Sequence, residues 1–201
     1  MNRSMILASG SPRRQELIKM ICDAYDVITA DIDESAVPGE KPQELVYRLA
    51  YLKAKKVFEE TAEKGARIVI GADTVVALGD EILGKPADRA DASRMLHALS
   101  GSHHTVSTGV AILWDEGGEM RSARFIETTQ VDFWELTEEE IEQYIDSHEP
   151  DDKAGAYAIQ MQGGLFVKGI SGDYSNVVGF PISRIYHTMK DAGLLGGFPV
   201  K

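Results

Sequence analysis

The chain has 201 residues, of which 43% are hydrophobic and 26% are charged, and its formal net charge is −11. This composition excludes an intrinsically disordered protein. No apolar run approaches the ~18 residues that a membrane-spanning helix needs, and the apolar stretch at 5–8 is too short for the core of a signal peptide. The single cysteine, Cys22, is expected to be a reduced, half-buried helix residue in a cytoplasmic protein without a membrane partner.

The negative charge is concentrated in residues 125–152, which hold 11 acidic residues and no Lys or Arg. The other 173 residues are balanced, with 21 acidic and 21 basic side chains. A protein that binds duplex nucleic acid normally has a basic excess, because contacts to phosphates dominate its affinity. We therefore expect no duplex nucleic acid as partner, whereas a small anion held by a local basic site is allowed. We expect the acidic stretch to be solvated and to lie away from the functional cleft.

The hydrophobic pattern predicts strands alternating with helices along the chain. In chain order, we expect strands at 5–9, 25–30, 67–78, 81–83, 104–114, 121–134 and 165–170, and helices at 12–22, 42–64, 88–99, 181–192 and after a capping box at Thr137. The segment from Arg121 onward is typical of a hairpin partner of 104–114. This order predicts an α/β fold with a long, mixed central sheet flanked by helices. At this length one domain is expected, with two lobes that share a core as the next option.

Residues 9–14 (Ser-Gly-Ser-Pro-Arg-Arg) begin the first predicted helix, with Ser11 at the N-cap. Arg13 and Arg14 then place positive charge at the positive end of the helix dipole, which is unfavourable. When a helix with a favourable N-cap nevertheless carries unfavourable charges in its first turn, those charges indicate a functional role. The hydroxyls of Ser9 and Ser11, two guanidinium groups and free backbone N–H groups can converge on an anion, as a polyphosphate requires. The alternative is that nearby acids pair with these arginines at the surface.

Asp73 interrupts a segment at 68–78 that is otherwise typical of a fully buried strand. A buried carboxylate is costly unless it is hydrogen-bonded, paired or bound to a metal. Thr74 supplies a hydroxyl beside it. Asp73 can therefore hold a divalent cation or orient a water molecule for attack. The alternative is a turn or bulge at 71–72 that exposes Asp73 to water.

Four further residues have weaker individual signals. Glu34 belongs to an acidic cluster that can contribute to a metal site, although acidic loops are common. Lys85 stands between a glycine and a proline, which suits a positioned phosphate contact or an exposed loop lysine. Lys53 lies on the long predicted helix, where most lysines are solvated. Gln160 offers both a donor and an acceptor for the edge of a base, or ends a core strand.

In this order and spacing, the motifs resemble those of the Maf family of nucleotide pyrophosphatases from Leu7 to about Ile182. The motifs that carry the resemblance are Ala8-Ser-Gly-Ser-Pro-Arg-Arg14, Arg48-Leu-Ala50 with Lys53-Ala54, Gly71-Ala-Asp-Thr74, Gly84-Lys-Pro86, Leu99-Ser-Gly101, Asp152-Lys-Ala-Gly-Ala-Tyr157 with Ile159-Gln160, and Val177-Val-Gly-Phe-Pro181. The resemblance implies one domain over 1–201, similar to the inosine triphosphate pyrophosphatases, with two lobes around a cleft. It also implies that the chain can form a homodimer.

The resemblance further implies cleavage of a nucleoside triphosphate between its α and β phosphates, with Mg²⁺ or Mn²⁺ as cofactor. The branch that acts on dTTP and UTP is the most similar, and modified pyrimidine triphosphates are further candidates. In the family, Asp73 matches the proton acceptor, and Arg13, Thr74 and Gln160 match the specificity positions. Two alternatives are a purine enzyme acting on ITP or XTP, and a nucleotide-sensing regulator of cell division without turnover.

On this reading, each candidate residue has an expected role. The residues expected to bind the phosphate chain are Ser9, Ser11, Arg13, Arg14, Lys53 and Lys85. Glu34 and Asp73 are expected to hold the cation, and Asp73, Lys85 and Glu34 form the expected catalytic set.

Overall fold

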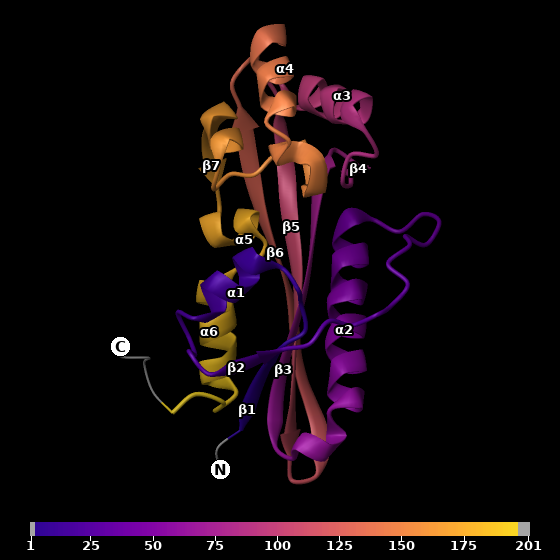
Figure 1. The fold of residues 1–201 in the computed structure, drawn as a ribbon. Coiled ribbons are helices and arrows are strands. Elements are labelled where there is room, and N and C mark those ends of the chain that lie inside the picture. Colours follow the sequence, from indigo (N-terminus) through magenta and orange to yellow (C-terminus); the bar gives the residue numbers. More distant parts are fainter. Residues whose placement is uncertain (1–2, 197–201) are drawn as a thin grey trace.

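The computed structural model describes residues 3–196, so the ends of the predicted 1–201 domain lie outside the described residues (Figure 1). The strands are β1 (Ser4–Leu7), β2 (Tyr25–Val27), β3 (Arg67–Leu78), β4 (Glu81–Leu83), β5 (His103–Glu116), β6 (Glu119–Phe133) and β7 (Val167–Ser171). The α-helices are α1 (Pro12–Ile18), α2 (Pro42–Glu60), α3 (Arg89–Leu99), α4 (Glu138–Asp146), α5 (Tyr174–Val178) and α6 (Ile182–Asp191). Short 3-10 helices are η1 (Ala62–Lys64), η2 (Glu149–Asp152), η3 (Ala154–Ala156) and η4 (Gln162–Phe166).

The seven strands form one mixed sheet in the order β2-β1-β3-β5-β6-β7, with β4 paired to β3. β1 is parallel to its two neighbours, β2 and β3. The pairs β3–β5, β5–β6 and β6–β7 are antiparallel. The predicted α/β class with a long mixed sheet is therefore confirmed. So are the strands at 67–78 and 81–83 and the hairpin of β5 and β6. No helix among the described residues is both long and apolar enough to cross a membrane.

Several predicted boundaries are wrong. The predicted strand at 165–170 starts too early, because residues 165 and 166 belong to η4 and β7 begins at Val167. Leu165 is hydrophobic but 79% exposed, so its hydrophobicity does not indicate a buried strand residue. Cys22 is half-buried but follows α1, which ends at Ile18. The helix predicted to reach Lys64 ends at Glu60 and continues only as η1. The short helix α5 has no hydrophobic period long enough to predict it.

Helices cover both faces of the sheet (Figure 1). On one face, α2 packs its alanines and Val57 on Ile6 and Val69. On the other, α1 and α6 pack on β1 and β3 around a second apolar cluster. A third cluster, built from α3, α4 and the far ends of β5 and β6, lies at the other end of the long strands. The sheet thus joins two core regions, as layered α/β folds require.

Helix α2 lies unusually close to the sheet because two glycines face it. A Cβ atom on Gly71 would lie 2.5 Å from the carbonyl oxygen of Ala50, and one on Gly109 would lie 2.2 Å from that of Val46. Both distances are far below a van der Waals contact, so only glycine fits at these positions. The close approach brings the next turn of α2, which carries Lys53, beside β3.

One edge of β3 is open in its middle. β1 pairs with residues 67–70 of β3, and β4 pairs with residues 76–78. Residues 71–75 therefore have no neighbouring strand on that edge among the described residues. An open edge leaves backbone groups to be satisfied by side chains, water or a ligand. It also lets side chains from both faces of the sheet reach one cleft.

Candidate functional site

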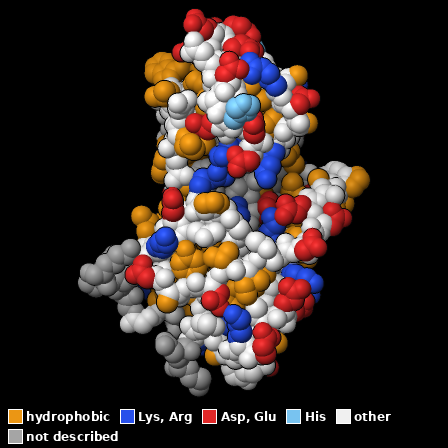
Figure 2. All heavy atoms as spheres, in the orientation of Figure 1, with side chains coloured by type: hydrophobic (Ala, Val, Ile, Leu, Met, Phe, Trp, Pro, Cys, Tyr) orange, Lys and Arg blue, Asp and Glu red, His pale blue; other side chains and the backbone are white. Residues whose placement is uncertain are grey.

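A cleft of about 730 Å³ lies at the open edge of β3. Figure 2 shows basic and acidic side chains gathered around a hollow midway along the molecule. The charged residues that line the cleft are Arg13, Arg14, Lys53, Lys85 and Lys153, with Glu34, Asp73 and Asp152. The remaining lining includes apolar and polar residues from α2, β3, β4 and the segment around Gln160. A cleft of this size and charge can hold a small polyanion with a partly apolar body.

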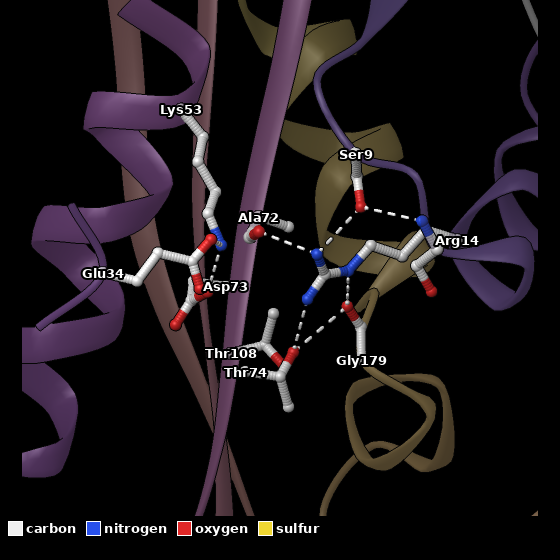
Figure 3. A network of polar contacts seen from close by, with 10 residues as sticks. Ser9, Arg14, Glu34, Lys53, Ala72, Asp73, Thr74, Thr108 and Gly179 are labelled. Carbon is white, nitrogen blue, oxygen red and sulfur yellow. Dashed lines mark hydrogen bonds and ion pairs between the residues drawn. The ribbon is translucent and has the colours of Figure 1, made fainter. Parts of the chain in front are cut away.

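Lys53 joins two carboxylates at the centre of the cleft (Figure 3). Its Nζ lies 2.6 Å from Oδ1 of Asp73 and 2.9 Å from Oε1 of Glu34. Burial raises the pKa of the Asp73 carboxyl above its ordinary value, while the charges of Lys53 and Arg14 oppose that shift. Such a carboxylate has the environment of a general base, because desolvation makes it a better proton acceptor.

Asp73 belongs to a regular strand. The β3–β5 register is continuous from Ile68 opposite Trp114 to Ala77 opposite Thr105, so the alternative of a bulge at 71–72 is wrong. The Asp73 side chain is 14% exposed and paired with Lys53. Because successive side chains of a strand point to opposite faces, Asp73 faces α2 whereas Thr74 faces α1 (Figure 3).

Arg14 occupies the other face of β3 and replaces part of the missing strand there. Its Nη1 donates to the carbonyl oxygen of Ala72 at 2.8 Å and to Oγ of Ser9 at 3.1 Å. Its Nε donates to the carbonyl oxygen of Gly179 at 2.8 Å, and its Nη2 donates to Oγ1 of Thr74 at 2.9 Å. Four of the five N–H groups of a guanidinium are thus bound to the protein. Burial lowers the pKa of Arg14 from its ordinary value, which still leaves it charged.

The start of α1 places four of the predicted residues together, namely Ser9, Ser11, Arg13 and Arg14. Ser9 is buried, and its Oγ also accepts a hydrogen bond from the backbone N–H of Ser11 at 3.3 Å. Ser11 is the N-cap residue, as predicted, but its side chain makes no capping hydrogen bond. Arg13 lines the cleft together with Ser11 and Arg14. The alternative in which a nearby acid neutralises Arg14 at the surface does not fit, since Arg14 donates to the four protein groups named above.

The cleft also contains residues that come from distant segments. Lys85, from the loop after β4, and Gln160, from the loop before η4, both line it. All of the predicted site residues except Ser9 line this cleft, and Ser9 supports it through Arg14. The structure thus brings together residues that lie up to about 150 positions apart in the sequence (Ser11 and Gln160).

Two charged cleft residues differ from the sequence expectations. Asp152 ends the acidic stretch that we expect to lie away from the cleft, yet it lines the cleft, so that expectation is wrong for this residue. Lys153, which pairs with Asp152, is a cleft residue that the sequence reasoning misses; its side chain is only 12% exposed. The cause is Gly155, whose φ of 69° and close fit on Val76 turn the chain back onto β3. The sequence feature that could have indicated it is its position: Lys153 is the first Lys or Arg after a stretch, 125–152, that has none.

The cleft lining includes an aromatic side chain, Tyr157, whose ring is held by buried neighbours. Tyr157 lines the cleft, and its hydroxyl lies 2.8 Å from Nε2 of the buried His104. Phe133 packs edge-on against both rings. Burial lowers the pKa of His104 to about 4, so the imidazole is neutral near pH 7. Tyr157 is itself only 6% exposed, so it offers a ligand a small, partly apolar contact that its neighbours hold in place.

The carboxylates of Glu34 and Asp73 are the expected ligands of a divalent cation. Among the described residues, no group of three or more His, Cys, Asp or Glu side chains could hold a metal ion by itself. Mg²⁺ commonly binds through one or two carboxylates together with substrate phosphates and water. The carboxylates of Glu34 and Asp73, both paired with Lys53 in an open cleft, therefore fit a cation that binds together with a phosphorylated ligand.

Comparisons with known proteins show the family of this chain. A family model described as "Maf-like protein" matches residues 4–192. A dTTP/UTP pyrophosphatase of Bacillus anthracis is 46% identical over 188 residues, covering 94% of this chain and 95% of that protein. One of Bacillus cereus (strain AH187) is 47% identical with the same coverage. A nucleoside-triphosphatase / dITP/XTP pyrophosphatase of Mycobacterium abscessus covers 65% of this chain and 74% of its own with 12% identity, but its TM-score of 0.39 supports no inference.

Proposed function

Because the chain belongs to the Maf family, we propose that it is a nucleoside triphosphate pyrophosphatase that hydrolyses dTTP and UTP, with modified pyrimidine triphosphates as further substrates. The products are the nucleoside monophosphate and pyrophosphate. The names of its relatives support this substrate choice. The single observation that carries the proposal is the pairing of Lys53 with both Asp73 and Glu34 inside a cleft lined by further cations.

In the proposed mechanism, a water molecule attacks the α-phosphorus and the bond to the β-phosphate oxygen breaks. Asp73 takes the proton of the water, since its carboxylate lies in the cleft beside Lys53. Arg13, Lys53 and Lys85 stabilise the negative charge that develops on the phosphate oxygens. Ser11 and Arg14, which line the cleft, complete the phosphate-binding set, and Ser9 supports it through its hydrogen bond with Arg14. Pyrophosphate leaves with the electrons of the broken bond.

Glu34 and Asp73 are the proposed ligands of a divalent cation, either Mg²⁺ or Mn²⁺. When bound, such a cation polarises phosphate oxygens and lowers the pKa of bound water. Lys53 then holds the two carboxylates together at the reacting centre. Thr74, Gln160 and Arg13 are the proposed specificity residues, with the base lying near Gln160 and Tyr157.

The experiment is a product analysis with a panel of nucleoside triphosphates plus Mg²⁺ or Mn²⁺, on the wild type and on Asp73→Asn. We expect monophosphate and intact pyrophosphate, formed fastest from dTTP or UTP. Loss of the general base should slow turnover roughly 10²–10⁴-fold, while a calorimetric titration with nucleotide still detects binding.

Four outcomes would contradict the proposal. Diphosphate with orthophosphate would exclude cleavage at the α-phosphorus. Wild-type turnover by Asp73→Asn would exclude Asp73 as the base. Fastest turnover of ITP or XTP would support the purine alternative, and tight binding without turnover would support the nucleotide-sensing regulator.

We further propose that the chain works in the cytoplasm as one domain with two lobes around the cleft, and that it forms a homodimer. The two core regions joined by the long strands support the two-lobe description. Light scattering coupled to size-exclusion chromatography tests the oligomeric state, and a mass of one chain would exclude the dimer.

A further inference from the structure

Glu34 reaches the site from a segment that has little structure of its own. It lies between β2 and α2, where residues 28–41 contain no helix or strand. No backbone-to-backbone hydrogen bond joins residues 31–36 to the rest of the described chain. The Glu34 side chain is 58% exposed, yet its Oε1 lies 2.9 Å from Nζ of Lys53. Something other than regular structure must therefore hold the segment in place.

Arg48 makes the contacts that hold it. This residue lies on α2, five positions before Lys53. Its Nε and Nη2 donate to Oε1 and Oε2 of Glu40 at 2.6 and 2.7 Å, a bidentate pair. Its Nη2 also donates to the carbonyl oxygen of Ser35 at 3.0 Å, directly beside Glu34. The same helix thus binds the backbone next to Glu34 and the carboxylate of Glu34 itself.

The contacts of Arg48 are part of a small closed network. The carboxylate of Glu40 is 9% exposed and also accepts a hydrogen bond from the N–H of Val37 at 3.0 Å. Oδ1 of Asp33 accepts from the N–H of Ser35 at 2.9 Å, which forms a turn around Glu34. Bidentate arginine–carboxylate pairs are directional as well as strong. A lysine could not make the same three bonds, because it lacks the planar fork.

We propose that Arg48 is a positioning residue for the reaction: by holding Ser35 and Glu40, it fixes the carboxylate of Glu34 beside Lys53 and Asp73. The kinetic part of this inference rests on the proposed function. Without Arg48, the segment around Glu34 spends only part of its time at the site, so kcat falls by that fraction. KM changes little, because Arg13 and Lys85 bind phosphate from other segments.

The test is a double-mutant cycle with dTTP as substrate and saturating Mg²⁺. Three variants are compared: Arg48→Ala, Glu34→Ala and the double variant. The control is Arg94→Ala, which removes an exposed arginine of α3 that pairs with Glu81 and Asp91. We expect Arg48→Ala to lower kcat about 10- to 100-fold, as small misplacements of catalytic groups do. The double variant should match Glu34→Ala within about twofold, because residues that act as a unit are not additive. Losses that multiply would overturn the inference.

A second measurement does not depend on turnover. The protease Glu-C cuts after glutamate, so its rate at the bond after Glu34 reports how often this segment opens. We expect Arg48→Ala to be cut faster there than the wild type and Arg94→Ala, and equal rates would overturn the inference. Because cleavage needs no substrate, this result stands even if the wild type hydrolyses no nucleotide. If Arg48→Ala fails to fold, Glu40→Gln removes the carboxylate charge and should show the same changes to a smaller degree.

Discussion

Arg13 and Arg14 are adjacent residues of one type in one helical turn, yet their surroundings differ. Arg14 donates to the backbone of Ala72 and Gly179 and to the hydroxyls of Ser9 and Thr74. Arg13 lines the cleft. Successive residues of a helix point about 100° apart, so one can enter the sheet edge while its neighbour faces a ligand.

Replacing these two arginines by lysine should therefore have different effects. Arg14→Lys removes the planar fork and leaves buried carbonyl groups without donors, so we expect the free energy of unfolding to fall by about 2–3 kcal/mol. Arg13→Lys keeps the charge at the cleft, so its unfolding free energy should stay within about 0.5 kcal/mol of the wild type while KM rises. Urea denaturation and steady-state kinetics measure both. Equal stability of the two variants would contradict the distinction.

The residue types predict much of the candidate site. A carboxylate in an apolar run is expensive, which singles out Asp73, and paired arginines at a helix start are unfavourable, which singles out residues 13–14. What the sequence could not predict depends on tertiary contacts. The path of the chain at Gly155, which brings Lys153 into the cleft, follows from its fit on Val76. The contacts of Arg14 and Arg48 likewise join segments that no local pattern links.

At the scale of elements, helix α2 presents both Lys53 and Arg48, and its position depends on the glycines beneath it. Gly109→Ala would place a methyl group on the backbone of Val46, only 2.2 Å from the carbonyl oxygen of that residue. Because backbone must move, we expect a loss of about 3 kcal/mol in the free energy of unfolding. The displaced helix should also lower turnover, since Lys53 moves relative to Asp73.

Gly169→Ala is the matched control for this change. Gly169 also lies in a strand, but nothing stands within 4 Å of its added Cβ. Its unfolding free energy should stay within about 0.5 kcal/mol of the wild type, and its turnover should be unchanged. Urea denaturation and initial rates measure both variants. A Gly109→Ala protein as stable and active as Gly169→Ala would show that the close approach of α2 is not required.

The elements themselves are predictable where the hydrophobic period is long. The strands β3, β5 and β6 and the helices α2, α3 and α4 follow from apolar spacing, and Asp88 and Thr137 accept the expected capping hydrogen bonds. Short elements are not predictable in this way. α5 and the four 3-10 helices are too short to show a hydrophobic period. Leu165 is exposed although its side chain is of a type that usually indicates burial. Their places depend on packing against the sheet.

At the scale of the whole molecule, the net charge of −11 comes mainly from acidic side chains outside the cleft. The acidic stretch lies mainly on β6 and α4, where Glu138 pairs with His97 and Glu142 pairs with Arg89. Near the cleft, positive and negative side chains are mixed. A negatively charged protein can therefore still bind a triphosphate, provided that a cation offsets the carboxylates of the site.

Ligand binding should therefore stabilise the whole chain, and the cation should be part of that effect. The cleft is lined by α1, α2, β3 and the segments after β4 and η2, so a bound nucleotide connects elements from both core regions. At 100 times its Kd, an α,β-methylene analogue of dTTP, which resists cleavage, should add about 2.7 kcal/mol to the free energy of unfolding. For a chain of this size that corresponds to a rise in Tm of roughly 5–10 °C.

Removing the cation separates its contribution from that of the nucleotide. With EDTA in place of Mg²⁺, the triphosphate meets the carboxylates of Asp73 and Glu34 without a divalent charge between them, so the rise in Tm at the same analogue concentration should shrink to well below half. Differential scanning calorimetry measures the effect, with thymidine as the control, since it carries the base but no phosphate. An equal rise in Tm with and without Mg²⁺ would show that Lys53 alone neutralises the two carboxylates, and that the cation acts after binding or not at all.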